Sequence, residues 1–346
     1  MNILLTGGAG YIGSHTAVEL IGKGHYVIIF DNLSNSSIDV LDRIFDITGF
    51  KPTFYESDVN DRDALLDVFV RENIDAVIHF AGLKSVTESA DFPIRYYENN
   101  VMGAVNLVAV MDEVNVKSLV FSSSASVYGT PENLPITEDE TTKPVSIYGK
   151  SKLYAEEFMS DVAVADPSWK FIFLRYFNPV GAHESGKIGE KPDGIPNNLA
   201  PYITEVILNK REHLCVYGDD YPTYDGTGIR DYIHIKDLAE GHVAAITHIE
   251  HQLGGTEVFN LGTGKGSSVL EVIKGFEQDL GEKVRYKIDK RRVGDVAECF
   301  ADVSKAKAVL GWEAKLSLPE MCKSALKFAA QFSSNGAQTT ESKSEK

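Results

Sequence analysis

The chain has 346 residues, of which 43% are hydrophobic, and its 50 acidic and 34 basic residues give a net charge of −16. This charge excludes a nucleic-acid binder held by counterion release, and the apolar fraction is high enough for a sizeable core. No apolar run reaches the roughly 18 residues of a membrane span, and the start lacks the basic segment of a secretory leader. We therefore expect a cytoplasmic protein that binds neither nucleic acid nor a membrane.

From the first residue, short apolar runs rich in β-branched residues alternate with segments of helical period. This alternation is typical of a parallel sheet covered by helices on both faces, and predicts a doubly wound α/β fold. The expected strands are 2–6, 26–30, 53–55, 76–80, 119–122 and 171–174, and the expected helices between them are 15–23, 61–72, 93–115 and 148–164.

The composition changes after Phe177, where residues 178–198 are rich in glycine and proline, as irregular segments are. An amphipathic segment at 199–210, an apolar run at 232–235 and a helical pattern at 236–250 follow. We predict a first domain over 1–177, a smaller C-terminal α/β domain over 178–332 with some segments packing back on the first, and a disordered tail over 333–346.

The first expected strand is followed directly by the string GGAGYIG at residues 7–13. Glycines at this spacing allow a tight turn and let backbone N–H groups approach a pyrophosphate at a helix N-terminus. Because the string follows a strand and opens a helix, it predicts the dinucleotide-binding loop of a Rossmann domain.

Asp31 ends the second expected strand, where its carboxylate can accept hydrogen bonds from the adenosine ribose of NAD and would repel the 2′-phosphate of NADP. We therefore expect NAD as the cofactor, with a simple turn over 31–35 as the alternative. Asp58 ends the third strand and is a candidate for the adenine amino group, or a plain helix cap before Asp61.

Tyr148 and Lys152 are four residues apart and share one face of an expected helix. Ser124 closes a run of serines at the end of the fifth strand, where α/β sheets place their ligands. A tyrosine serves as acid and base on an alcohol if its pKa of about 10 falls towards about 7, which needs about 4 kcal/mol. A cation about 4 Å from the phenol stabilises the phenolate by about 4 kcal/mol at an effective dielectric constant of about 20. These three residues are the expected catalytic group; an ordinary aromatic and a surface lysine are the alternative.

These motifs resemble the extended short-chain dehydrogenase/reductases and, within them, the UDP-glucose 4-epimerases, over almost the whole chain short of the tail. Strings that carry the resemblance are TGGAGYIGSH at 6–15, HFAGLK at 79–84, RYFNPVGAH at 175–183, IPNNL at 195–199 and DGTGIRDYIH at 225–234. The resemblance implies an isomerase of galactose metabolism that interconverts UDP-galactose and UDP-glucose through a 4-keto sugar, with NAD reduced and reoxidised in each cycle.

The resemblance also implies residue roles, with Tyr148 as the acid and base, Ser124 bonded to the sugar 4-oxygen, and Lys152 on the nicotinamide ribose. Residues 1–177 would bind NAD, residues 178–332 the UDP-sugar, and a homodimer would form through helices 93–115 and 148–164. The residues implied to bind NAD are Gly7, Gly10, Tyr11, Ile12, Gly13, Asp31, Asn32, Leu33, Ser34, Asn35, Ser36, Asp58, Val59, Phe80, Ala81, Gly82, Lys84, Asn99, Ser124, Tyr148, Lys152, Tyr176 and Phe177. Those implied to bind the UDP-sugar are Lys84, Ser124, Tyr148, Asn178, Asn198, Leu199, Tyr217, Arg230, Arg292, Asp295 and Cys299.

Two departures within this family bear on the substrate. Related nucleotide-sugar 4,6-dehydratases carry an Asp-Glu pair where this chain has Ala125 and Ser126, so elimination is disfavoured. Many bacterial epimerases have a tyrosine where this chain has Cys299. Our hypothesis is that the smaller side chain admits the N-acetylated sugars of UDP-GlcNAc and UDP-GalNAc; a cysteine that only packs is the alternative.

Other functions stay open at this point. Another nucleotide-sugar epimerase or dehydratase of the same fold is one, and a non-catalytic NAD-sensing regulator is another, although the intact triad speaks against it. His242, His248 and His251 match no usual zinc spacing, and we expect no metal.

Overall fold

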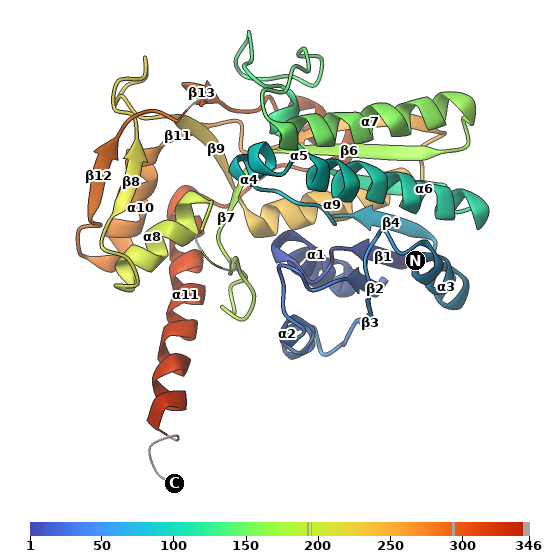
Figure 1. The fold of residues 1–346 in the computed structure, drawn as a ribbon, viewed down its shortest axis with the longest axis horizontal. Coiled ribbons are helices and arrows are strands. Elements are labelled where there is room, and N and C mark those ends of the chain that lie inside the picture. The colour runs from blue at the N-terminus through green and yellow to red at the C-terminus, as the bar shows by residue number, and fades with distance from the viewer. Residues whose placement is uncertain (192–193, 195, 293–294, 342–346) are drawn as a thin grey trace.

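The computed structural model describes residues 1–191, 194, 196–292 and 295–341. In Figure 1 a large twisted sheet with helices on both faces lies beside a smaller group of strands and helices, and helix α11 (Leu318–Glu341) projects from the latter. The expected α/β fold is confirmed.

The large sheet contains all six expected strands and one more. They pair in parallel in the order β10-β6-β5-β4-β1-β2-β3. The six are β1 (Asn2–Thr6), β2 (Tyr26–Asp31), β3 (Thr53–Glu56), β4 (Ala76–His79), β5 (Ser118–Ser124) and β6 (Lys170–Tyr176), and the seventh is β10 (Gly255–Leu261). Strand β10 lies in the stretch predicted as the second domain, and it pairs with β6 of the large sheet.

Alternate residues of each strand point to opposite faces of the sheet, so one strand contributes side chains to two hydrophobic cores. In β1, Ile3 and Leu5 pack with residues of α1, α2 and α9, whereas Leu4 packs with residues of α3, α6 and α7. The helices of this region are α1 (Tyr11–Gly22), α2 (Asp39–Thr48), α3 (Arg62–Glu72), α4 (Val86–Asp91), α5 (Pro93–Tyr96), α6 (Gly103–Glu113), α7 (Ile147–Ala165) and α9 (Ile235–Ile249), with a short 3-10 helix η2 (Ala125–Val127).

The helix expected at 93–115 is interrupted by a π-helical segment, η1 (Tyr97–Met102), between α5 and α6. Such wide turns occur often at functional sites because they redirect side chains. The segment contains Asn99 and Asn100, so the interruption falls on the part of the helix that the resemblance linked to the cofactor.

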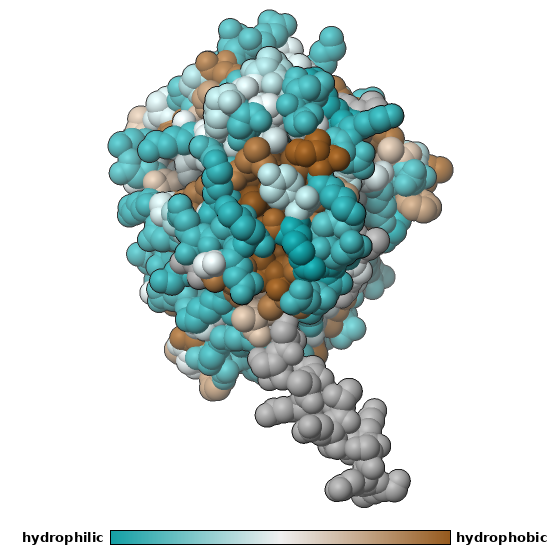
Figure 2. All heavy atoms as spheres, turned by 90° about the vertical axis from the view of Figure 1, so that its left-hand side faces the viewer, coloured by the Kyte–Doolittle hydropathy of each residue, from teal (hydrophilic) through white to brown (hydrophobic). Residues whose placement is uncertain are grey.

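The smaller region builds its own core from residues such as Ile203, Val216 and Phe276. Figure 2 shows one face of this side of the molecule, where a band of hydrophobic surface lies between hydrophilic rims. Its elements are β7 (Asn178–Val180), α8 (Leu199–Ile207), β8 (Leu214–Tyr217), β9 (Ile229–His234), β11 (Gly266–Ser268), α10 (Val269–Leu280), β12 (Tyr286–Asp289), β13 (Glu298–Cys299) and α11 (Leu318–Glu341), whereas the π-helical η3 (Ala306–Leu310) packs against α9 in the core of the large sheet.

The C-terminal segment differs from the expected tail. Helix α11 continues to Glu341, past the predicted tail start at residue 333, while residues 342–346 lie outside the described part of the chain. Among the described helices, including α11, none combines the length and the apolar character needed to cross a membrane.

Candidate active site

The candidate residues gather at the carboxyl edge of the large sheet. The strand order reverses direction between β1 and β4, and in open α/β sheets ligands bind at such a switch point. The glycine loop follows β1, Phe80 to Gly82 follow β4, and Ser124 ends β5. The topology therefore brings together residues that are far apart in the sequence.

The glycine loop has no room for side chains at three positions, Gly7, Gly8 and Gly13, where an added Cβ would lie less than 3.0 Å from another atom. Gly7 has a φ of +70°, and a Cβ there would lie 2.6 Å from the Ala81 nitrogen. A Cβ on Gly13 would lie 2.6 Å from the Gly7 oxygen and 2.7 Å from Gly8 Cα. Helix α1 begins immediately after Gly10, whose lack of a side chain leaves the first N–H groups without a side-chain cap. This arrangement fits a pyrophosphate at the helix N-terminus.

A Gly13→Ala substitution tests the loop. Overpacking of this kind costs about 1–3 kcal/mol, and we expect NAD to be bound about ten- to a hundredfold more weakly. The measurement is the NAD content of the purified variant and its NAD affinity by calorimetry. Gly22→Ala is the matched control in the same helix, because a Cβ there meets no atom within 4 Å; an equal loss of NAD in both variants would contradict the prediction.

Asp31 is buried and joins the glycine loop to the loop after β2. Its carboxylate accepts hydrogen bonds from Ala9 N at 3.0 Å, Leu33 N at 2.8 Å and Ser36 Oγ at 3.1 Å. A carboxylate has about four acceptor positions, so one stays for a ribose hydroxyl. Burial raises the pKa of Asp31 and the three donors lower it, with burial the larger cause.

Asp58 lies beside this site and does not cap a helix. Its Oδ2 accepts a hydrogen bond from Asn32 Nδ2 at 2.6 Å, and its Oδ1 accepts one from Asn60 N at 2.9 Å. The N-cap of α3 is Asp61, which accepts from Ala64 N. The helix-cap alternative for Asp58 is therefore wrong.

Ser124 at the end of β5 meets Tyr148 of α7, and Lys152 lies one turn further along the same helix. The Ser124 hydroxyl bonds the Tyr148 phenol and lowers its pKa, but burial is the larger cause and the net pKa lies above the ordinary value. Lys152 is buried, donates from Nζ to the Ser122 carbonyl at 2.8 Å, and has its pKa lowered to about 8 by burial. A Cβ on Gly82 would lie 3.3 Å from this ammonium, so the chain just after β4 passes close to it.

Some residues of this edge were not singled out from the sequence. Asn100, not Asn99, is the buried amide of the π-helical segment: it accepts from Leu83 N at 2.7 Å and donates to Ser151 Oγ at 2.9 Å. Asn99 is half-buried in the same segment. Tyr176 and Phe177, which the family resemblance does imply, are buried at the same edge, and the Tyr176 hydroxyl bonds Ser122 Oγ.

Five of the residues expected to bind the UDP-sugar form one cluster. Asp295 lies between two arginines, with Oδ2 3.0 Å from Arg292 Nε and Oδ1 3.8 Å from Arg230 Nη2. The Arg292 guanidinium lies 4.8 Å from the centre of the Tyr217 ring. Cys299 stands opposite Arg230 in the pairing of β13 with β9. The cluster offers cations for a pyrophosphate and an aromatic face for a base.

A second group links the two halves of the site through Glu190, which sequence patterns did not reveal. Its Oε1 accepts from Lys84 Nζ at 2.9 Å and from Asn198 Nδ2 at 2.6 Å. Asn198 is the residue before helix α8, which begins at Leu199, and Asn178 begins β7 beside Tyr232 of β9. Lys84 and Asn198 are thus neighbours in space, as a shared ligand would require.

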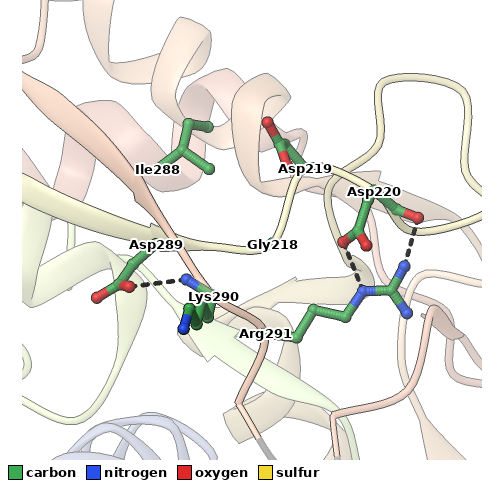
Figure 3. Close-up of a pocket in the computed structure, with 7 residues that line it drawn as sticks. All are labelled: Gly218, Asp219, Asp220, Ile288, Asp289, Lys290 and Arg291. Atoms are coloured by element: carbon green, nitrogen blue, oxygen red, sulfur yellow. Dashed lines mark hydrogen bonds and ion pairs between the residues drawn. The ribbon is translucent and has the colours of Figure 1, made fainter.

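A cavity of about 470 Å³ lies next to the cluster of Tyr217 and Arg292. It is lined by residues 218–220 and 288–291 (Figure 3). Arg291 donates from Nε to Asp220 Oδ1 at 2.6 Å and lies 4.1 Å from the Tyr221 ring centre. Figure 3 shows this guanidinium turned towards Asp220. None of the three candidate catalytic residues lines the cavity, so we assign the chemistry to the sheet edge and not to this space.

Two of the three histidines weighed as metal ligands, His242 and His248, have other hydrogen-bond partners. His242 is buried and bonds the Leu238 carbonyl through Nδ1 at 2.9 Å, and His248 lies 2.9 Å from Glu257. In the part of the chain that the structure describes, no three His, Cys, Asp or Glu side chains are arranged to hold a metal ion.

Comparison with known proteins identifies the family. A family model described as GDP-mannose 4,6 dehydratase matches residues 4–325. The UDP-glucose 4-epimerase of Bacillus subtilis (strain 168) is 55% identical over 322 residues, which cover 93% of this chain and 95% of that protein.

Solved structures agree with this match. UDP-glucose 4-epimerase from Bifidobacterium longum, in complex with NAD+ and UDP, superposes with a TM-score of 0.93 at 53% identity over 96% of this chain and 98% of that one. The enzyme from Stenotrophomonas maltophila, with bound NAD and formylated UDP-arabinopyranose, gives a TM-score of 0.95 at 46% identity over 97% and 99%. The chain belongs to the UDP-glucose 4-epimerase family, within the extended short-chain dehydrogenase/reductases.

Proposed function

We propose that the protein is an NAD-dependent 4-epimerase that interconverts UDP-galactose and UDP-glucose through a 4-keto sugar. The observation that carries the proposal is the contact of Ser124 with Tyr148, one helical turn from buried Lys152, at the same sheet edge as the glycine loop. The named activity of the relatives supports the same conclusion.

NAD fits the residues of the first domain. The loop at residues 7–13 would hold its pyrophosphate, Asp31 its adenosine ribose, and Lys152 its nicotinamide ribose. When bound, NAD supplies the acceptor for the hydride of sugar C4 and the donor that returns it to the opposite face. The remaining residues proposed to line the NAD site are those implied by the family resemblance, with Asn99 and Lys84 among them.

The chain itself handles the proton. Tyr148 takes the proton of the 4-hydroxyl as hydride leaves C4, and returns it when hydride comes back. Ser124 donates to the sugar 4-oxygen and keeps it beside the phenol. Because burial raises the pKa of Tyr148, the phenolate needs the positive charge of Lys152 close by.

The UDP part would be gripped while the hexose turns over. Arg230 and Arg292 are proposed to bind the pyrophosphate, because guanidinium forks match phosphate oxygens. Tyr217 would stack on the base, and Asp295 orients both arginines. The ribose and the rest of UDP would meet Asn178, Asn198 and Leu199.

A 4,6-dehydratase, the activity in the description of the matching family model, fits the geometry less well. Elimination needs an acid and a base for C6 and C5, and the residues after Ser124 are Ala125 and Ser126. Ser126 uses its backbone N–H to bond Ser124 Oγ at 3.1 Å. Neither side chain carries a group for that proton transfer, so the epimerase is favoured.

Incubation of the purified protein with UDP-galactose, without added NAD, tests the proposal. We expect UDP-glucose to accumulate to equilibrium, as resolved by ion-exchange chromatography of the sugar nucleotides. Net NADH formation or a dehydrated 4-keto-6-deoxy product would overturn it.

For assembly we propose a homodimer in the cytoplasm, formed through the surface of α5, η1 and α7. This surface exposes Ile94 at 72%, Met102 at 49% and Tyr154 at 45% of their area. Tyr154 stacks on Tyr97 at a centroid distance of 6.0 Å, so the two rings form one apolar face. Light scattering coupled to gel filtration checks the mass; a monomer would contradict the proposal.

A Cys299→Tyr substitution tests the proposed use of N-acetylated substrates. Cys299 packs against the apolar cluster that contains Tyr128 and Phe177, close to the end of β5. Filling this space should lower kcat/KM for UDP-GalNAc by about ten- to a hundredfold and leave that for UDP-galactose within about twofold. Cys299→Ala, which keeps the space open, should retain both activities. Equal loss of both in the tyrosine variant would contradict a role in substrate range.

A further inference from the structure

A buried ion pair lies next to the candidate catalytic group, and the proposed reaction does not use it. Glu156 of α7 and Arg175 of β6 have side chains only 4% and 8% exposed, with Oε2 and Nη2 2.5 Å apart. Arg175 Nε adds a second bond of 3.0 Å to Oε1, and the Ser123 hydroxyl donates to the same oxygen. Desolvation offsets the attraction in such pairs, so stability alone does not account for it.

The position of Glu156 on α7 connects it to the catalytic group. Tyr148, Lys152 and Glu156 follow one another at intervals of four and share one face of the helix. Each meets one residue at the end of β5: the phenol meets Ser124, the ammonium bonds the Ser122 carbonyl at 2.8 Å, and the carboxylate bonds Ser123. Three successive turns of α7 thus contact the last three residues of β5, which anchors the helix against the end of this strand.

Polar groups from several elements surround Lys152, and most of them carry no charge. His79 of β4 has its pKa lowered to about 3 by burial and by Lys152, so it is neutral. Asn100 of η1 and the Ser122 carbonyl are uncharged, and Arg175 is paired with Glu156. Among the described residues, Glu156 is the charge that raises the pKa of Lys152 against the lowering by burial.

We propose that Glu156 is a positioning residue: its buried negative charge holds the Lys152 ammonium, and its bond with Ser123 seats Tyr148 against Ser124. The proposal rests on the proposed epimerase function, in which Lys152 must carry its charge. Arg175 compensates the buried negative charge of Glu156, which would be costly to leave without a partner.

Glu156→Gln removes the charge and keeps the size and the acceptor for Ser123. With less negative charge nearby, Lys152 gives up its proton at lower pH. The basic limb of kcat/KM for UDP-galactose should therefore move down by about one pH unit, while the bound NAD stays within about twofold of wild type. A readout independent of turnover is the titration of Lys152, followed by NMR of 13Cε-labelled lysine. The Lys152 signal is assigned by its loss in Lys152→Arg, and its titration in Glu156→Gln should also move to lower pH.

Two further variants keep the test decisive. Ser123→Ala removes the hydrogen bond to Glu156 but no charge, so kcat should fall if that bond seats Tyr148, while the basic limb should stay at the wild-type pH. If the lone Arg175 prevents Glu156→Gln from folding, Glu156→Gln with Arg175→Gln removes the pair together. The basic limb of this double variant should also move to lower pH, but by less than in Glu156→Gln, because Arg175 no longer adds positive charge.

The outcomes separate this proposal from the proposed function. A wild-type protein that makes no UDP-glucose refutes the epimerase. If the wild type is active but both Glu156 variants keep its basic limb and its Lys152 titration, the role of Glu156 is refuted. A basic limb that moves to higher pH in these variants refutes it as well.

Discussion

Tyr148→Phe is expected to abolish most turnover, lowering kcat by about 10²–10⁴-fold, while the protein keeps its fold and its NAD. The phenol is the group that can exchange a proton with the sugar hydroxyl, and phenylalanine preserves the ring that packs at the site. Ser124, whose hydroxyl bonds the phenol, would remain in place to bind the sugar. The measurement is steady-state epimerisation of UDP-galactose, together with NAD content and the melting temperature.

Tyr154→Phe is the matched control for this substitution. Tyr154 lies on the same helix, and its side chain is 45% exposed. Loss of its hydroxyl should leave kcat within about twofold of wild type. A Tyr148→Phe enzyme with kcat near wild type would show that another group moves the proton, and the proposed mechanism would fall.

The strands were predictable because their signal is local. Runs such as those in β1 and β2 are buried on both faces and are therefore continuously apolar. Strand β10 was missed because its first residues, Gly255 to Glu257, are not apolar. It pairs with β6, far away in sequence, and such a pairing leaves no mark in a short window.

The candidate site was predictable where backbone geometry or helical spacing demands a residue type. Gly13 has no room for a side chain, and Tyr148 and Lys152 stand one helical turn apart. Glu156 and Asp231 were missed, because a buried carboxylate looks like a surface carboxylate in the sequence. Asp231 is bonded to Ala301, 70 positions away, and only the folded chain reveals such a partner.

Asp231 carries the second large effect that we expect, on the half of the site that would hold UDP. It follows Arg230 in β9, and its side chain is completely buried. Oδ1 accepts from Thr263 N at 2.8 Å and Thr263 Oγ1 at 2.6 Å, and Oδ2 accepts from Gly264 N at 3.0 Å and Ala301 N at 3.2 Å. One carboxylate thus ties β9 to the loop before β11 and to the chain just after Cys299.

Asp231→Asn should destabilise this clamp, because an amide has one acceptor oxygen and its NH2 group would face two donors. Each buried donor left without an acceptor costs about 1–3 kcal/mol, so we expect a loss of about 2–5 kcal/mol in the free energy of unfolding, measured by urea denaturation. UDP should bind at least about tenfold more weakly, because Arg230 and Cys299 lie on the strands that the clamp joins. NAD held by the first domain should change less.

Asp302→Asn is the matched control in the same segment. The Asp302 carboxylate accepts from Ser304 N at 2.8 Å at an exposed position. Water can replace that bond, so the free energy of unfolding should stay within about 0.5 kcal/mol of wild type. If Asp231→Asn lowered the free energy of unfolding as little as this control does, the four hydrogen bonds of Asp231 would not position Arg230 opposite Cys299. The pairing of β9 with β13 alone would then have to align the two residues.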